Sequence, residues 1–312
     1  MNDFIPVANP QFSEDDARAV YDVVNSGWVS MGKKVQEFEH LVCDYTDSKY
    51  AVAMNNGTST LHAILLALEI GPGDEVILPS LTYISSANVV LYVGATPVLC
   101  DNNLDSFNVE PEHIQQKITK HTKAFMTVDL KGMPVDYDAF NNLSKQTGIT
   151  FISDSAESLG AEYKNKKSGS FGDTGCFSLH PLKNLNVWGD GGIVTTNNKE
   201  LADKLKLIRN HGLISRDKNL IFGYNSRLDS VQAVVANHLL KRIKIITDKR
   251  IKNSMYLEKN LKKLNKFIFK KRSKNLVEVF HLYEFRVNNS KLRNKLVDFL
   301  RKNSIDAKIH YP

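Results

Sequence analysis

The segment 175–192 has the sequence GCFSLHPLKNLNVWGDGG, in which one lysine, Lys183, lies between an apolar run and a glycine-rich turn. The residues before and after it have the composition of short strands, so we expect Lys183 in a loop between two strands. Leu182, Leu185 and Trp188 would shield it from water. Partial desolvation favours the neutral amine, which can attack a carbonyl to form a Schiff base. The alternative is an ordinary exposed lysine, which is the commoner arrangement.

The composition of the 312 residues, 42% hydrophobic and 24% charged, is typical of a globular protein. No apolar run approaches the ~20 residues that a membrane helix needs. The first residues lack the basic and apolar blocks of a signal peptide. The three cysteines, Cys43, Cys100 and Cys176, are odd in number and widely spaced. We therefore expect a cytoplasmic protein with reduced thiols, without a membrane partner and, because the histidines show no ligand spacing, without a metal.

The net charge of +7 is concentrated in residues 241–274, which hold 14 Lys or Arg and only two acidic residues. Apolar residues recur in this segment at helical spacing. The pattern predicts one or two amphipathic helices with a solvated basic face. Nucleic-acid binding is the alternative, but the segment has few aromatic residues to accompany its charge. We expect no nucleic-acid partner.

The middle of the chain alternates apolar strand candidates with helical segments. The predicted strands are residues 50–54, 75–78, 96–100, 124–128 and 150–153, and the predicted helices include 14–24, 35–45, 61–68, 83–92 and 111–119. Continuous apolar strands separated by helices indicate an α/β fold with a mostly parallel sheet covered on both faces. Ligands of such folds lie at the carboxyl ends of the strands.

A change of composition after the middle of the chain predicts two domains. Residues 1–240 would form an N-terminal arm and a large domain, and residues 241–312 a small C-terminal domain. The end of the chain, from residue 277, has the pattern of a strand, a helix and a strand. A long helix around residue 240 would connect the two domains.

Several polar residues follow predicted strands. Gly57 and Thr58 open a helix, whose free N–H groups and dipole could hold an anion, although many such residues only cap helices. Asp154 ends a strand and could hold a proton on a heterocyclic nitrogen, or it could be a helix cap. Ser178 could add a hydroxyl to a phosphate. Tyr83 could stack on a flat cofactor, or pack in the core.

Together with Lys183, these residues supply the contacts that pyridoxal phosphate requires. They would provide a phosphate cradle, a stacking ring, a carboxylate for the pyridine nitrogen and an amine for the aldehyde. A protonated pyridine ring can take up the electrons of a carbanion. The sequence therefore predicts pyridoxal phosphate as the cofactor.

The sequence resembles the DegT/DnrJ/EryC1/StrS family of sugar-nucleotide aminotransferases over essentially its whole length. The motifs that carry the resemblance are residues 27–32, 37–39, 56–58, 71–77, 154–160, 178, 183–185, 189–192, 225–229 and 310–312. The block around Lys183 is the most specific of them. The resemblance implies the type I fold of pyridoxal-phosphate-dependent transferases, with a large mostly parallel sheet domain and a smaller C-terminal α/β domain.

The resemblance also implies a role for each matching residue. Lys183 would bind pyridoxal phosphate covalently, and Asp154 would pair with the pyridine nitrogen. Glu157 stands where relatives place His, Gln or Glu near the phenolic oxygen of the cofactor. The phosphate would be held by Gly57, Thr58 and Ser178, and the ring by Tyr83.

Asn225 matches an asparagine that reaches the phosphate from the neighbouring subunit, which implies a homodimer. The implied reaction is a ping-pong transamination from glutamate to a nucleotide-linked keto sugar, for which a 4-keto-6-deoxy sugar is expected. The product would be an amino sugar for a surface polysaccharide or glycan. The dehydratase branch of the family carries histidine at the lysine position, so Lys183 favours transamination.

Two features depart from the family pattern. Residues 128–132 are VDLKG where relatives usually have Val-His-Leu-Tyr-Gly, so no substrate role is carried over to this loop. Relatives also continue well past the His-Tyr-Pro motif at 310–312, which implies a fragment or an incomplete small domain. A truncated, non-catalytic homologue that acts as a binding protein is therefore the alternative from another class.

Overall fold

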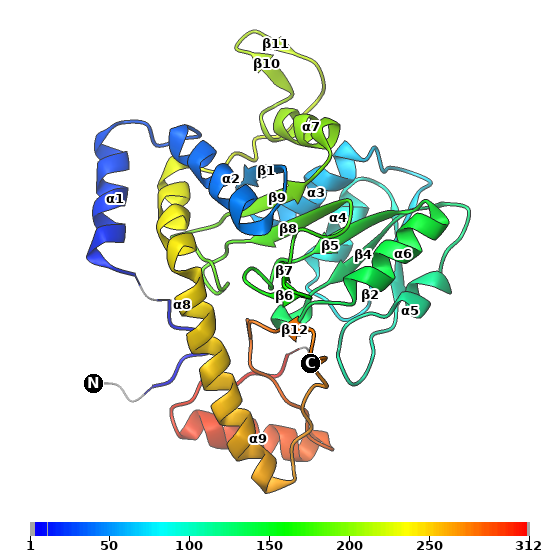
Figure 1. The fold of residues 1–312 in the computed structure, drawn as a ribbon, viewed down its shortest axis with the longest axis vertical. Helices are drawn as coiled ribbons and strands as arrows, with labels where there is room; N and C mark the ends of the chain where they lie inside the picture. Colours follow the sequence, from blue (N-terminus) through cyan, green and yellow to red (C-terminus); the bar gives the residue numbers. More distant parts are fainter. Residues whose placement is uncertain (1–3, 11, 311–312) are drawn as a thin grey trace.

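The fold is built on a seven-stranded sheet (Figure 1). The computed structural model describes residues 4–10 and 12–310, so part of the predicted N-terminal arm and the last two residues of the His-Tyr-Pro motif lie outside it. In order across the sheet, the strands are β1 (Tyr50–Met54), β9 (Gly192–Thr196), β8 (Thr174–Ser178), β5 (Thr150–Asp154), β4 (Thr122–Val128), β2 (Glu75–Pro79) and β3 (Thr96–Cys100). Only β9 runs antiparallel to its neighbours, which confirms the predicted mostly parallel sheet.

Both faces of the sheet are covered by helices, because its central strands carry buried apolar side chains on both sides. On one face, Val76 and Leu78 pack with α3 (Gly57–Ala67), α4 (Ser85–Tyr92) and α7 (Lys199–Arg209). On the other face, Ile77 packs with α5 (Pro111–Gln115) and α6 (Tyr137–Thr147). Burying this apolar surface is the main source of the fold's stability.

A third apolar cluster joins the N-terminal helices to the sheet. It contains residues of α1 (Glu14–Asn25), α2 (Lys33–Thr46), β1, β9 and α8 (Ser230–Leu261). Ser13 caps α1: its hydroxyl accepts a hydrogen bond from Asp16 N, and the Asp16 carboxylate accepts one from Ser13 N, which makes a capping box.

The basic segment 241–274 begins inside α8, which is one continuous helix and ends in a 3₁₀ turn, Lys262–Leu264. Of the apolar residues in this segment, Ile243 is buried in the third cluster and Ile246 packs against it, whereas Ile245, Met255 and Leu257 are exposed. The proposed domain boundary near residue 240 falls in the middle of this helix. Figure 1 shows α8 running from the sheet towards α9 (Ser290–Lys302).

After α8 the chain adds a strand to a separate three-stranded sheet. Strand β12 (Leu276–Val277) pairs with β6 (Glu162–Tyr163), which also pairs with β7 (Lys166–Lys167). The predicted strand and helix at the end of the chain are found, but the predicted last strand is only a bridge between Ile305 and Ile5. The helix predicted for 111–119 was too long, because α5 ends at Gln115 and the following residues form turns.

A hairpin of β10 (Leu213–Ser215) and β11 (Lys218–Asn219) projects from the domain beyond α7 (Figure 1). It is exposed, and it belongs to neither of the other two sheets. Along the described residues, no helix has both the length and the apolar composition needed to cross a membrane.

Candidate active site

Lys183 lies in the loop between β8 and β9, as predicted. Its side chain is 17% exposed, and its Nζ lies 3.3 Å from Glu157 Oε1. The predicted apolar shield is only partly correct. Leu185 is fully buried, but Leu182 and Trp188 are 43% and 37% exposed because they lie on the outer side of the loop. A carboxylate, and not an apolar shield, is the main neighbour of the amine.

Asp154 is the last residue of β5, which pairs with β8. Its carboxyl group is buried, with Oδ2 accepting a 3.0 Å hydrogen bond from Ser86 Oγ and Oδ1 a 3.1 Å bond from Ala156 N. Burial raises the pKa of Asp154 to about 6, because the negative charge loses its hydration. A cation or a protonated nitrogen in contact with this carboxylate would restore part of the lost stabilisation.

Glu157 connects three parts of the chain. Its Oε1 lies 3.3 Å from Lys183 Nζ and 3.3 Å from His281 Nε2, and its Oε2 accepts a 2.7 Å hydrogen bond from Lys131 N. Burial by itself would raise the pKa of Glu157. The hydrogen bond from His281 and the charge of Lys183 outweigh burial and hold this pKa well below its usual value. The carboxylate is therefore negatively charged at neutral pH.

Gly57 and Ser178 come together at the start of α3. A Cβ atom at Gly57 would lie 2.8 Å from Cβ of Ser178, so only glycine lets the two backbones approach this closely. Asn56 caps the helix through a 2.7 Å hydrogen bond from Ser59 N to its Oδ1. A helix start leaves its first N–H groups outside the helix's own hydrogen bonds. The N–H groups of Gly57 and Thr58, together with the Ser178 hydroxyl, are therefore donors suited to binding an anion.

Tyr83 and Asn225 lie at the margin of this group. The Tyr83 ring is 61% exposed and precedes α4, whose Ser86 reaches Asp154. Asn225 is exposed, and its neighbour Ser226 accepts a 2.9 Å hydrogen bond from Asn55 N. The structure brings Lys183, Glu157 and Asp154 to one edge of the sheet, whereas these two side chains are open to solvent.

The residues present fit pyridoxal phosphate. The site combines an amine on a loop, a buried carboxylate on the adjacent strand and a helix start that a Cβ atom would obstruct. These are the groups that the aldehyde, the pyridine nitrogen and the phosphate need. Within 4–10 and 12–310, no group of three or more potential metal ligands occurs.

Sequence reasoning missed three neighbours of the site: Ser86, Lys131 and His281. Ser86 could have been found from its spacing, because it follows the predicted site residue Tyr83 by about one helical turn. No such signal existed for His281, because the chain returns to Glu157 only through the tertiary fold.

The departure from the family pattern at residues 128–132 has a structural explanation. Asp129 is buried and accepts hydrogen bonds from the Tyr137 hydroxyl, from Ser158 Oγ at 2.5 Å and from Ser155 Oγ at 3.1 Å. It therefore fixes the loop that presents Lys131 N to Glu157.

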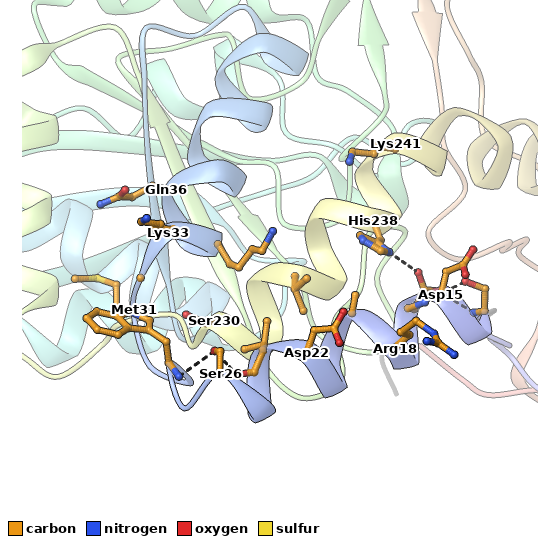
Figure 2. A pocket seen from close by; sticks show the side chains of 18 of the residues that line it. Asp15, Arg18, Asp22, Ser26, Met31, Lys33, Gln36, Ser230, His238 and Lys241 are labelled. Carbon is orange, nitrogen blue, oxygen red and sulfur yellow. Dashed lines mark hydrogen bonds and ion pairs between the residues drawn. The ribbon is translucent and has the colours of Figure 1, made fainter.

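A large cavity lies elsewhere, between α1, the start of α2 and α8 (Figure 2). Its volume is about 1340 Å³, and its lining includes none of the predicted site residues. Asp16, which is buried there, pairs with Arg242 at 2.6 Å and with His238 at 3.3 Å. Because its buried acid already has partners and Lys183 is not in its lining, we do not place the chemistry in this cavity.

Comparison with known proteins places the chain in a family. The model of the DegT/DnrJ/EryC1/StrS aminotransferase family matches residues 10–312. The chain is 42% identical over 242 residues to a GDP-perosamine synthase of Caulobacter vibrioides, covering 77% of this chain and 65% of that protein. It is 37% identical over 305 residues to a dTDP-3-amino-3,6-dideoxy-alpha-D-galactopyranose transaminase of Aneurinibacillus thermoaerophilus, covering 97% and 83%.

A solved structure agrees with this assignment. The PLP form of Spr1654 from Streptococcus pneumoniae superposes with a TM-score of 0.90 at 29% identity, covering 99% of this chain and 85% of that one. The predicted α/β fold of the pyridoxal-phosphate-dependent aminotransferases and the predicted cofactor are thereby confirmed. The chain belongs to the DegT/DnrJ/EryC1/StrS aminotransferase family.

Proposed function

We propose that this aminotransferase transfers an amino group from glutamate to the keto group of a nucleotide-linked sugar, with a 4-keto-6-deoxy sugar as the expected acceptor. The observation that carries the proposal is the 3.3 Å contact of Lys183 with Glu157, beside the buried carboxyl of Asp154. The two relatives named for amino-sugar products support the substrate class. The amino sugar would serve a surface polysaccharide or glycan.

Three side chains would do the chemical work. When bound, pyridoxal phosphate supplies an electron-accepting ring and an aldehyde carbon that carries the amino group between the two substrates. Lys183 Nζ would bind the cofactor and, when free, move a proton at the reacting carbon. Asp154 would hold the proton of the ring nitrogen, since a buried carboxylate gains from an adjacent positive charge. Glu157 would lie near the phenolic oxygen and orient Lys183 Nζ.

The remaining predicted residues would hold the cofactor in place. The N–H groups of Gly57 and Thr58 and the Ser178 hydroxyl would bind the phosphate at the positive end of the α3 dipole. Tyr83 would stack on the ring. Its exposed side chain lies on the segment before α4, the helix whose Ser86 contacts Asp154.

A homodimer would complete the site, with Asn225 reaching the phosphate of the neighbouring subunit. The segment before Asn225 supports this arrangement, because it carries apolar side chains that are open to solvent, among them Leu220, Phe222 and Tyr224. Phe222 is 99% exposed. Large apolar side chains exposed close together in the sequence are a feature of protein interfaces.

We further propose that residues 1–240 and 241–312 form two domains joined through α8, and that the enzyme works in the cytoplasm. We propose no nucleic-acid partner, because several basic residues of 241–274 already pair with acids of this chain. Arg272 contacts Glu258 at 2.7 Å, and Lys244 contacts Asp248 at 2.7 Å.

The test is to incubate the enzyme and pyridoxal phosphate with glutamate and a panel of nucleotide-linked 3-keto and 4-keto sugars. Mass analysis should show exchange of the keto oxygen for an amine with one class of sugar, and no exchange with Lys183→Ala. Loss of a sugar hydroxyl without amine transfer would instead indicate a dehydratase. Failure to bind pyridoxal phosphate would indicate a non-catalytic homologue.

A further inference from the structure

Two nitrogen atoms share one oxygen of Glu157. Lys183 Nζ and His281 Nε2 each lie 3.3 Å from Oε1, while Oε2 is occupied by Lys131 N at 2.7 Å. His281 follows β12, so the contact joins the C-terminal segment of the chain to the candidate active site. The imidazole is buried, so the contact lies in the interior of the protein.

The charges around the pair determine which atom donates. Glu157 is negatively charged, because its pKa is held well below the usual value even though burial opposes this. Burial lowers the pKa of His281, and the Glu157 carboxylate only partly offsets this effect. The imidazole is therefore neutral at neutral pH, and a neutral ring next to a carboxylate must carry its proton on the facing nitrogen. Nε2 is the donor and Glu157 Oε1 the acceptor.

Other charged groups also face the pair. Glu157 is close to Lys131 and Lys183, and its charge acts on Asp154 and His310. His281 is also affected by Lys183 and Arg250. Lys183 Nζ also donates to Oε1 at 3.3 Å, but it is carried on a flexible side chain. A hydrogen bond from a rigid ring defines the direction of the carboxylate more closely.

The backbone of His281 is fixed from two sides. Its N–H donates to Lys131 O at 3.0 Å, and Arg250 Nη1 donates to its carbonyl oxygen at 3.2 Å. Val279 N donates to Gly132 O at 2.9 Å, and a Cβ at Gly132 would lie 2.7 Å from the Val279 side chain. Gly132 has φ +89°, a conformation that favours glycine. The hydrogen bonds of the surrounding backbone therefore hold His281 in place.

We propose that His281 is a positioning residue of the active site, which holds the Glu157 carboxylate against Lys183 through the hydrogen bond from Nε2. The role rests on the proposed function of Glu157 and Lys183 in the reaction. The contact itself can be measured in the ligand-free protein. The two claims can therefore fail separately.

The test compares His281→Leu, which removes the donor, with His281→Gln and His281→Asn. Glutamine carries its amide nitrogen as many bonds from Cα as Nε2 of histidine, and asparagine carries it one bond closer. Only glutamine can therefore reach Oε1. The pKa of Glu157 is read by ¹³C NMR of glutamate-labelled protein, with the resonance assigned by its loss in Glu157→Gln.

We expect the pKa of Glu157 to rise by about one unit in the Leu and Asn variants and to stay near the wild-type value in the Gln variant. With substrates, kcat should fall in the Leu and Asn variants and recover with Gln. A Glu157 titration unchanged in folded Leu or Asn variants would overturn the proposal. If His281→Leu does not fold, the Gln and Asn pair decides. If reduction traps no cofactor on Lys183, the proposed function fails but the titration still tests the contact.

Discussion

Ser86 Oγ donates a 3.0 Å hydrogen bond to Asp154 Oδ2, and this bond ties α4 to the carboxyl end of β5. Ser86 is itself close to Thr82, whose hydroxyl lies 2.9 Å away. The carboxylate proposed to face the cofactor is therefore oriented by α4, the helix that follows β2. Without the Ser86 donor, the Asp154 carboxylate would remain buried but would lose one of the hydrogen bonds that offset its desolvation.

The first prediction concerns this bond. Replacing Ser86 by Ala should weaken pyridoxal phosphate binding by about tenfold, because a hydrogen bond to a charged group contributes roughly 1.5–3 kcal/mol and part of this is recovered by water. Fluorescence titration of the ligand-free protein with the cofactor measures the change. Ser85→Ala, one position away and not in contact with Asp154, is the control and should bind normally. Equal affinity of the two variants would contradict the proposed orienting role.

The second prediction concerns pH. Burial raises the pKa of Asp154 from 3.8 to about 6, so the folded protein binds a proton between these values that the unfolded chain releases. The free energy of unfolding due to this group therefore falls as pH rises from about 4 to about 6, by about 3 kcal/mol in total. Asp154→Asn removes the effect.

Urea unfolding of wild-type and Asp154→Asn protein, without cofactor, measures this difference. The variant should gain stability relative to wild type between pH 4 and pH 7, and the difference should level off above pH 7. Taking the difference cancels the titration of groups common to both proteins. A pH-independent difference would show that Asp154 titrates normally.

The third prediction concerns the approach of α3 to β8. Gly57→Ala should destabilise the fold by about 1–3 kcal/mol, because its Cβ would lie 2.8 Å from Cβ of Ser178. Thermal unfolding measures the loss. Gly71→Ala is the matched control, since its nearest atom would be 3.8 Å away. An unchanged midpoint for Gly57→Ala would mean that the cradle is wider than the structure shows.

The fourth prediction concerns assembly. Phe222→Asp should convert the proposed dimer to monomer, because a charge replaces the most exposed apolar side chain next to Asn225. Light scattering after size-exclusion chromatography measures the mass. Phe299→Asp on α9, which removes another exposed phenylalanine, should leave the dimer intact. A dimer that persists in Phe222→Asp would place the interface elsewhere.

Much of the sheet could be predicted because its strands, five to seven residues long, each contain a short apolar run. Asp154 and Ser178 could be placed because they end β5 and β8, and Lys183 could be placed in the loop that joins β8 to β9. The Ser13 capping box is a local pattern as well, since it spans only four residues.

The contact between Glu157 and His281 could not be predicted, because it depends on the return of the chain after α8. Residue spacing carries no information about such a return. The exposure of Leu182 and Trp188 was missed for a related reason. A loop's apolar residues do not reveal which of them face the core, whereas strand and helix periodicity does.

The central claim is that Lys183 is the residue that binds pyridoxal phosphate. Borohydride reduction of the cofactor-saturated protein, followed by peptide mapping, tests it directly. We predict that the label lies on the peptide containing Lys183 and that Lys183→Ala takes up none. Label on another lysine, or no label in a folded and saturated sample, would contradict the account.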